Sequence, residues 1–191
     1  MPITILSVGR AALTVYAIPL FKMLELFRMR TLPIFLACVL VASSAQAQTA
    51  TADLKNGGGE TIGKVSLTAA PKGVLMRIES RGLTPGWHGL HFHEKADCSK
   101  ADFTSAGGHT HGAGDRIHGL LNPAANETGD LPNLYVDSHG VGVTEVFSGL
   151  ITLAALKDAD GSAVVIHANP DDHATQPIGG AGPRVACAEV R

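Results

Sequence analysis

The sequence predicts an all-β fold, an antiparallel sandwich or barrel whose function is carried by two long loops. Short runs of β-branched and apolar residues recur between clusters of Gly, Pro, Asn and Asp, and helical periodicity is scarce after Ala47. Two segments, 94–136 and 169–184, are rich in Gly, Pro, Asp and His and do not fit strands. A compact domain rarely keeps irregular segments of that length unless they have a function, so we expect the functional residues there.

Seven strands are expected in order along the chain: Ala50–Leu54, Thr61–Ala69, Gly73–Ser80, Gly86–His93, Gly140–Phe147, Ala163–Ala168 and Val185–Ala188. The Asp-Ala-Asp-Gly run at 158–161 is a turn signal before the sixth strand. The last strand is expected to end early, because residues 188–191 lack an apolar finish. Many short strands separated by turn signals are typical of sandwiches and barrels.

The segment 1–47 is interpreted as a secretory signal peptide with an upstream extension, removed on export to the periplasm. Two arginines precede an apolar run at 32–42 that is too short to span a bilayer comfortably, and a small-x-small cleavage motif ends at Ala47. A membrane anchor is the alternative, although no stable membrane span is expected after cleavage. Met23 and Met29 are alternative start positions.

The mature chain, 48–191, forms a single acidic domain. It keeps 11 of the 15 basic side chains and 16 of the 17 acidic ones, so its formal charge is −5. An acidic domain without basic runs does not favour nucleic-acid binding. The domain is large enough to bury one core. Its oligomeric state, monomer or homodimer, is not determined by the sequence.

Two cysteines remain in the mature chain, Cys98 and Cys187. An even pair in an exported domain predicts one disulfide, and two buried free thiols are the alternative. A disulfide that closes so long a loop could contribute about 4–5 kcal/mol in the chain-entropy model.

Histidines are the most informative residues of the mature chain, and all nine lie in it: His88, His91, His93, His109, His111, His118, His139, His167 and His173. Imidazole is the commonest nitrogen ligand for copper and zinc. On the strand expected at 86–93, alternation places the imidazoles of His91 and His93 on one face, about 7 Å apart, where both can converge on one metal. Such a pair alone is a weak signal, and two solvated histidines are the alternative.

A second polar cluster lies in the first long loop and comprises His109, His111, His118, Glu127 and Asp130. This loop has few apolar residues, so a metal held by its side chains could supply its order. A polar surface loop is the alternative for this cluster. A pH-sensing surface is the alternative for the histidines as a whole, but it explains neither the strand pair nor the cysteine pair.

Seven motifs occur in order and with the spacing of a known family: Gly-Trp-His-Gly-Leu-His-Phe-His-Glu (86–94), Ala-Asp-Cys (96–98), Ser-Ala-Gly-Gly-His (105–109), His-Gly-Leu-Leu-Asn-Pro (118–123), Gly-Asp-Leu-Pro-Asn-Leu-Tyr (129–135), Val-Val-Ile-His (164–167) and Arg-Val-Ala-Cys (184–187). Over essentially all of 50–188 the chain resembles the copper/zinc superoxide dismutases, the bacterial periplasmic branch in particular. The resemblance implies a Greek-key antiparallel β-sandwich or barrel. It also implies an enzyme that disproportionates superoxide to dioxygen and hydrogen peroxide.

The resemblance further implies ligands for two metal ions. The implied copper ligands are His91, His93, His109 and His167. The implied zinc ligands are His109, which bridges the two ions, His118, Glu127 and Asp130.

Other residues gain roles from the same resemblance. Asp171 is implied as the carboxylate that links a copper-ligand histidine to a zinc-ligand histidine. Arg184 is implied as the catalytic guanidinium that attracts and orients superoxide, and His109 as a catalytic proton donor. Cys98 and Cys187 match the family disulfide.

One position departs from the family pattern, because Glu127 stands where the family has a third zinc histidine. A carboxylate oxygen binds zinc at about 2.0–2.2 Å, so a site of two histidines, Glu127 and Asp130 is chemically reasonable, though more anionic and less selective. Alternatively, His111 takes that place, or zinc is weak or absent. The alternative function is a periplasmic copper or zinc carrier without turnover, which would need no superoxide guide such as Arg184.

Overall fold

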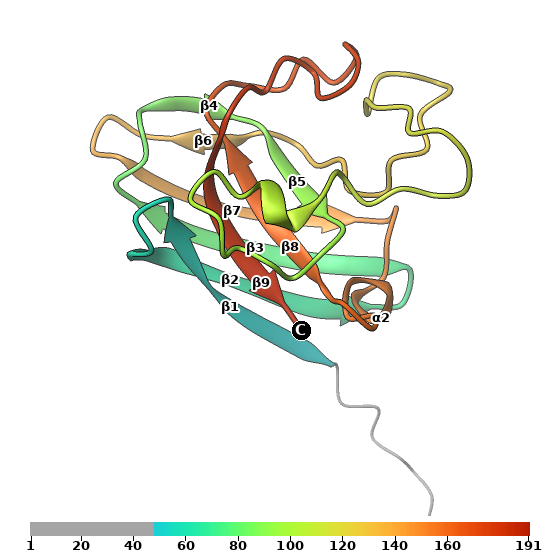
Figure 1. The fold of residues 1–191 in the computed structure, drawn as a ribbon, viewed down its shortest axis with the longest axis horizontal. Helices are drawn as coiled ribbons and strands as arrows, with labels where there is room; N and C mark the ends of the chain where they lie inside the picture. The colour runs from blue at the N-terminus through green and yellow to red at the C-terminus, as the bar shows by residue number, and fades with distance from the viewer. Residues whose placement is uncertain (1–47) are drawn as a thin grey trace, which may run out of the picture. The chain divides into compact units, whose positions relative to one another are not determined.

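The computed structural model describes residues 48–191; the expected export signal and its boundary lie outside the described residues. Strands dominate this part of the chain (Figure 1): β1 (Thr49–Asn56), β2 (Thr61–Ala70), β3 (Gly73–Arg81), β4 (Gly86–His88), β5 (Leu90–His93), β6 (Leu134–Val136), β7 (Val141–Ser148), β8 (Ser162–His167) and β9 (Arg184–Val190). One helical turn, α2 (Leu153–Leu156), precedes β8, and a short 3-10 turn, η1 (Thr104–Ala106), lies in the first long loop. Among the described residues, no helix has the length and apolar character needed to cross a membrane.

The strands form one antiparallel sheet in the order β4-β6-β7-β3-β2-β1-β9-β8-β5. Its two end strands, β4 and β5, are consecutive in the chain and separated only by Gly89. The sheet therefore curls until its two edges meet, which makes a flattened barrel and confirms the predicted all-β class.

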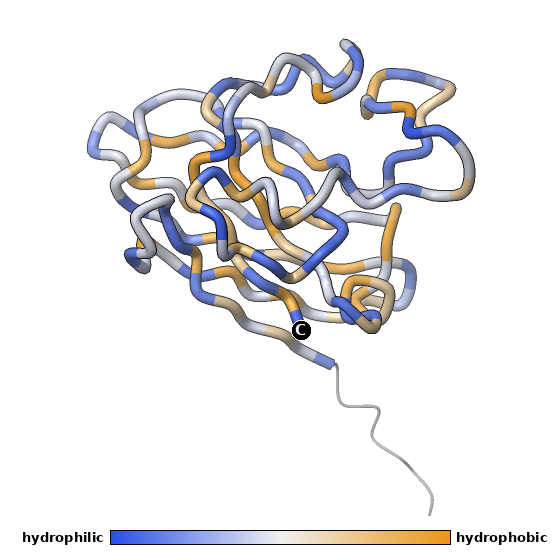
Figure 2. The backbone as a smooth tube through the Cα atoms, in the orientation of Figure 1, coloured by the Kyte–Doolittle hydropathy of each residue, from blue (hydrophilic) through white to orange (hydrophobic). Residues whose placement is uncertain are grey.

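The core lies inside this barrel. In β3, Val74, Met76 and Ile78 are buried while Arg77 and Glu79 face solvent, as the two-residue period of a strand requires. By contrast, every residue of β5 and β8 is buried. On their outer face, Phe103 of the first long loop packs with Val165 of β8, and Asp171 of the second long loop contacts His91 of β5, so residues on either side of these strands are removed from water. Figure 2 shows that the loops carry long hydrophilic stretches.

Gly89 interrupts the strand that the sequence predicts over 86–93. Its N–H donates to Asn169 O at 2.8 Å instead of to the sheet, and a Cβ at this position would lie 2.7 Å from Ala181 Cβ. The second long loop thus approaches the backbone closely where only glycine fits. That contact lies too far along the chain to be read from local pattern.

Two other expectations about strands are wrong. The segment 94–136 is not irregular throughout, because it ends in β6, whose three residues are too few to show alternation. The last strand continues to Val190, which is 1 % exposed and pairs with Ser162. Ala188 and Val190 are both buried, on either side of the exposed Glu189, and they supply the apolar finish that was not expected from the sequence.

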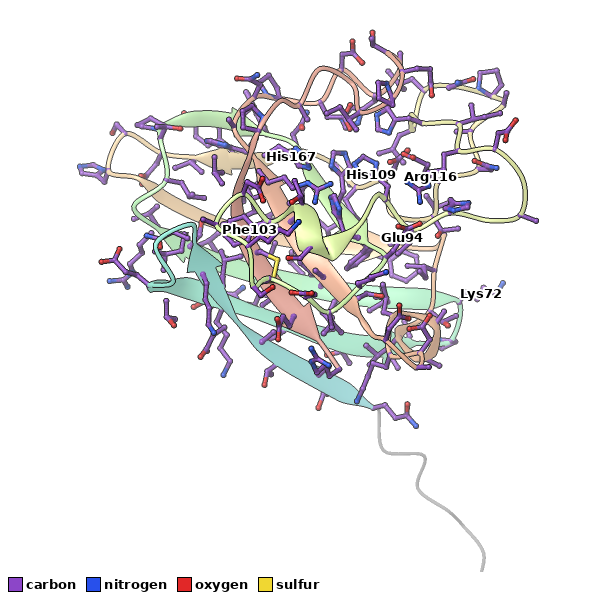
Figure 3. All side chains as sticks on the ribbon, in the orientation of Figure 1. Lys72, Glu94, Phe103, His109, Arg116 and His167 are labelled. Atoms are coloured by element: carbon purple, nitrogen blue, oxygen red, sulfur yellow. A yellow bond between two sulfur atoms is a disulfide. The ribbon has the colours of Figure 1, made fainter. Side chains whose placement is uncertain are left out.

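The predicted disulfide is confirmed. Cys98 and Cys187 are joined, with Cα atoms 5.9 Å apart and a sequence separation of 89 residues. The bond ties the start of the first long loop to β9, beside a small apolar cluster that includes Phe103 and Val165. It appears as the yellow bond near Phe103 in Figure 3.

Candidate metal centre

Backbone pairing, rather than side-chain packing, holds the first long loop against β5. Thr110 N donates to Phe92 O, Phe92 N donates to Gly129 O, and Gly129 N donates to Thr110 O, each at 2.9 Å. These bonds satisfy the free edge of β5 and extend the sheet by two short loop segments. The loop therefore has a source of order that the sequence did not reveal.

The same pairing brings loop side chains beside those of β5. His93 lies opposite His109 and His91 lies opposite Asp130 in this extension. On the other side of β5, β8 ends at His167, whose N–H donates to Gly89 O at 2.8 Å. Figure 3 shows His109 and His167 close to each other, and their ring centroids are 6.1 Å apart.

Four buried imidazoles form the first cluster: His91, His93, His109 and His167. One ring nitrogen from each lies within 4.8 Å of the others. In this structure, one nitrogen of each ring is buried without a hydrogen-bond partner: Nδ1 of His91 and Nε2 of His93, His109 and His167. Buried polar atoms are normally paired, so four such atoms facing one another call for a ligand.

The opposite ring nitrogens have partners that only accept hydrogen bonds. His91 Nε2 donates to Asp171 Oδ2 at 2.8 Å, His93 Nδ1 to Gly107 O at 3.0 Å and His167 Nδ1 to Gly182 O at 2.9 Å. A neutral imidazole carries one proton, so the nitrogens that face the cluster present lone pairs. Three lone pairs aimed at a common point suit a metal that favours imidazole ligands, such as copper.

The electrostatics of the cluster favour neutral rings. Burial, together with the neighbouring His109, lowers the pKa of His91 to about 4, even though Asp171 opposes the shift. Burial and the neighbouring His91 lower the pKa of His167 to about 3, and burial holds the pKa of His93 well below its usual value. These three side chains are therefore neutral at pH 7 and able to bind a metal.

A second cluster contains two imidazoles and two carboxylates. Glu127 Oε2 lies 2.7 Å from His109 Nδ1 and 2.8 Å from His118 Nδ1, while Asp130 Oδ1 lies 3.4 Å and 2.9 Å from the same two nitrogens. In a tetrahedral zinc site, ligand atoms about 2.0–2.1 Å from the ion are about 3.3 Å from one another. The donor set and its spacing therefore fit a zinc ion with a small expansion.

Charge is balanced differently in this second cluster. Burial disfavours the charged form of His118, but hydrogen bonds to Asp130, Asp171 and Glu127 outweigh it and raise the pKa of His118 to about 11. The pKa of His109 is also raised, because Asp130 and Glu127 oppose the effect of burial. Despite burial, the two histidines lower the pKa values of Glu127 and Asp130.

Asp171 connects the two clusters. Its Oδ2 accepts from His91 Nε2 at 2.8 Å, and its Oδ1 accepts from His118 Nε2 at 3.1 Å. Asn133 clamps the Asp171 backbone, since Asn133 Nδ2 donates to Asp171 O at 2.8 Å and Asp171 N donates to Asn133 Oδ1 at 2.9 Å. One buried carboxylate thus orients one imidazole of each cluster.

Arg184 lies at the edge of the first cluster. Its Nη1 donates to Phe103 O at 2.5 Å and its Nη2 to Gly107 O at 2.6 Å. Gly107 O also accepts from His93, and Arg184 pairs across the strands with His167. The guanidinium is half-buried, and burial lowers its pKa, although arginine stays charged at neutral pH. A fixed positive charge therefore lies next to the four imidazoles.

Comparison with known proteins agrees with this geometry. The family model described as copper/zinc superoxide dismutase (SODC) matches residues 61–190, which is most of the described domain. The chain belongs to the copper/zinc superoxide dismutase family. It is 56% identical to a superoxide dismutase [Cu-Zn] of Caulobacter vibrioides over 149 residues, which cover 75% of this chain and 86% of the relative.

The chain also matches family members at lower identity. Superoxide dismutase [Cu-Zn] 2 of Aquifex aeolicus is 39% identical over 159 residues, covering 80% of this chain and 92% of that protein. Among solved structures, a SOD-like protein from Bacillus subtilis is 32% identical with a TM-score of 0.66, covering 74% of this chain and 97% of its own. The Cu/Zn superoxide dismutase from Brucella abortus is 27% identical with a TM-score of 0.64, covering 75% and 100%.

Within this family pattern, the structure places Glu127 rather than His111 beside the two imidazoles. His111 Nδ1 donates to Gly112 O at 2.6 Å, and its Nε2 lies 3.6 Å from Glu94 Oε1. His111 pairs with Glu127 through the backbone alone. The imidazole of His111 therefore faces away from the donor atoms that meet around His118.

Three residues near the centre, none of them a proposed metal ligand, make supporting contacts. His88 is buried between Thr84 O and His167 O, at 2.8 Å and 2.6 Å, so it braces the strand end below the first cluster. His173 N donates to Asp171 Oδ1 at 2.6 Å, and Asn133 clamps the Asp171 backbone. No local pattern marks these contacts, because each joins segments more than 30 residues apart or depends on a loop backbone.

Proposed function

We propose that this chain disproportionates superoxide to dioxygen and hydrogen peroxide. The proposed copper ligands are His91, His93, His109 and His167, and the proposed zinc ligands are His109, His118, Glu127 and Asp130. The observation that carries the proposal is the set of four buried imidazole nitrogens that face one another without a hydrogen-bond partner. Family membership supports the same conclusion.

Bound copper supplies one-electron redox chemistry, and bound zinc, which keeps one oxidation state, supplies charge and order. The chain's own residues do the rest. Asp171, Gly107 O and Gly182 O hold three rings in the tautomer that presents a lone pair. His109 belongs to both clusters, and its Nε2 faces the first one. Whenever this nitrogen is not bound to copper, it could hold a proton and pass it to the peroxide product.

Electrostatics must bring an anion to an acidic domain. The mature chain carries a formal charge of −5, so the global field repels superoxide. Arg184, held by two carbonyls beside His93, supplies the local positive potential that attracts and orients the anion. Local positive potential that steers an anion can raise association rates about 10- to 1000-fold.

The test is metal analysis and a superoxide assay on one preparation of the mature protein. We expect one copper and one zinc per chain together with rapid loss of superoxide. Copper-loaded protein that leaves superoxide untouched would instead support the carrier without turnover.

We also propose that residues 1–47 direct export to the periplasm and that 48–191 is the mature enzyme. The disulfide supports export, because such bonds persist in oxidising compartments. N-terminal sequencing of the periplasmic protein is expected to begin at Gln48. A cytoplasmic protein that retains residues 1–47 would contradict this proposal.

A homodimer is proposed on the basis of one apolar surface. Trp87 and Tyr135 pair across β4 and β6, and Val143 follows on β7; all three are more than half exposed. Contiguous exposed apolar side chains of this kind are typical of association surfaces. Sedimentation velocity is expected to show a dimer for the wild type and a monomer for Tyr135→Glu. A monomeric wild type would remove this proposal.

A further inference from the structure

Glu127 gives the second cluster a donor set with two anionic oxygens. Its Oε2 contacts both imidazole nitrogens, His109 Nδ1 at 2.7 Å and His118 Nδ1 at 2.8 Å. Asp130 Oδ1 faces the same two nitrogens. A divalent ion held among these atoms would therefore have two nitrogen and two carboxylate ligands.

The two carboxylates differ in what their second oxygens do. Asp130 Oδ2 accepts a hydrogen bond from Gly119 N at 2.7 Å, which commits it to the backbone and leaves Oδ1 as the single ligand atom. Glu127 Oε1 accepts no hydrogen bond from any residue in 48–191. Carboxylates bind ions through one oxygen or through both. Glu127 can therefore supply one or two ligand atoms, which allows four or five ligand atoms in total.

Metal preference follows from these ligands. Imidazole suits zinc and copper, whereas carboxylate oxygens suit manganese and other ions that favour oxygen. If Glu127 binds through both oxygens, the fifth ligand atom also favours ions that prefer more than four ligands. We propose that Glu127 broadens the second metal position, so that it takes Mn²⁺ alongside zinc. This inference rests on the proposed two-metal function, because it assumes that the second cluster holds an ion.

Glu127 is buried and held in place, so a change in metal preference can be assigned to its side chain. It is 6 % exposed, and its backbone is fixed by pairing with His111 and by a 3.3 Å hydrogen bond from Glu127 N to Ile117 O. The carboxylate is thus delivered to the cluster by a fixed loop segment. Glu127→His restores an imidazole at this position, whereas Glu127→Gln keeps the shape and removes the charge.

The experiment measures competition between Zn²⁺ and Mn²⁺ for the second position. The first position is filled with Cu⁺, which is silent in electron paramagnetic resonance, so that the signal of free Mn²⁺ is read without an overlapping copper signal. The ratio of the Mn²⁺ and Zn²⁺ dissociation constants is expected to be at least about tenfold larger in Glu127→His than in the wild type. Glu127→Gln is expected to bind both ions more weakly than the wild type.

The visible spectrum of bound Co²⁺ gives a second readout, since its intensity falls when a fifth ligand atom is added. The wild type is expected to absorb more weakly than Glu127→His. An unchanged ratio of dissociation constants, or equal Co²⁺ intensities, would overturn the inference. Superoxide turnover of the copper-loaded wild type is measured in parallel. No turnover together with the tenfold change would overturn the proposed function and still support the role of Glu127.

Discussion

His91 donates a hydrogen bond from Nε2 to Asp171 Oδ2 over 2.8 Å, and both side chains are completely buried. The other carboxylate oxygen of Asp171 lies 3.1 Å from His118 Nε2. A single side chain therefore sets the ring orientation in both clusters. Because the rings must present their lone pairs inward, the binding of both ions in the proposed two-metal site would depend on a residue that contacts neither ion directly.

Asp171→Asn is expected to weaken the binding of both metals by about 10- to 100-fold. The amide would turn an N–H toward at least one ring N–H, which leaves a buried donor unpaired. Titration against chelators of known affinity measures the effect. The neighbouring Asp172→Asn is the matched control, because Asp172 is exposed and caps only the local turn at Ala174 and Thr175. Equal affinities for the two variants would contradict the role given to Asp171.

Arg184→Glu is expected to lower kcat/KM for superoxide by about 10- to 1000-fold while copper stays bound. The substitution replaces an attractive charge beside His93 with a repulsive one. Stopped-flow superoxide decay at several salt concentrations measures it. The wild-type rate should fall as salt screens the guanidinium.

Arg184→Lys separates charge from shape in the same experiment. Arg184 also braces Phe103 O and Gly107 O, so loss of these hydrogen bonds alone could disturb the loop. Lysine retains the charge and is expected to keep most of the rate. If the lysine and glutamate variants were equally slow with copper in place, steering by charge would be refuted.

The sequence predicts the identity of the clustered residues better than the way they meet. The His-x-His pair on a strand and the histidine-rich loop can be recognised from spacing alone. Their convergence depends on register, because His93 must lie opposite His109 and His91 opposite Asp130 in a sheet extension made by loop backbone. Local pattern contains no information about that pairing.

The errors in the strand prediction have the same physical origin. Gly89 ends a strand because the second loop, 80 or more residues later, contacts its backbone. β6 is three residues long, so two-residue alternation cannot appear in it. Asn133, the residue just before β6, uses its side-chain amide to make two hydrogen bonds to the Asp171 backbone, which only the folded loops create.

Zinc binding to the metal-free protein is expected to release at least one proton at pH 7. Hydrogen bonds to Asp130, Asp171 and Glu127 outweigh burial and raise the pKa of His118 to about 11, so this imidazole is protonated before the ion arrives. A metal ligand must be deprotonated, and the ion displaces that proton. Since protons compete with zinc, apparent affinity should rise between pH 7 and about 11.

Calorimetry in buffers of different ionisation enthalpy counts the released protons. The slope of observed enthalpy against buffer enthalpy equals the number released. The raised pKa also makes the stability of the metal-free fold depend on pH. Protonated His118 contributes its full stabilisation below the pKa of about 6.5 that a histidine has in the unfolded chain. That contribution is lost as pH rises toward 11. A slope of zero at pH 7 would show that His118 is already neutral.

Gly179→Ala is expected to disturb both clusters without changing any polar residue. Gly179 has φ +59°, and a Cβ there would lie 1.6 Å from Asp171 Oδ1 and 3.0 Å from His118 Nε2, so the carboxylate would have to move. Gly180→Ala is the matched control, since Gly180 has φ +73° but no atom within 4 Å of the added Cβ. Both alanines incur the cost of a left-handed backbone, about 1–2 kcal/mol. The difference between the two variants in free energy of unfolding therefore measures the clash alone. Urea unfolding and chelator titration are expected to show larger losses for Gly179→Ala, in zinc affinity above all. Equal losses for the two variants would mean that Asp171 tolerates displacement and does not set the ring of His118.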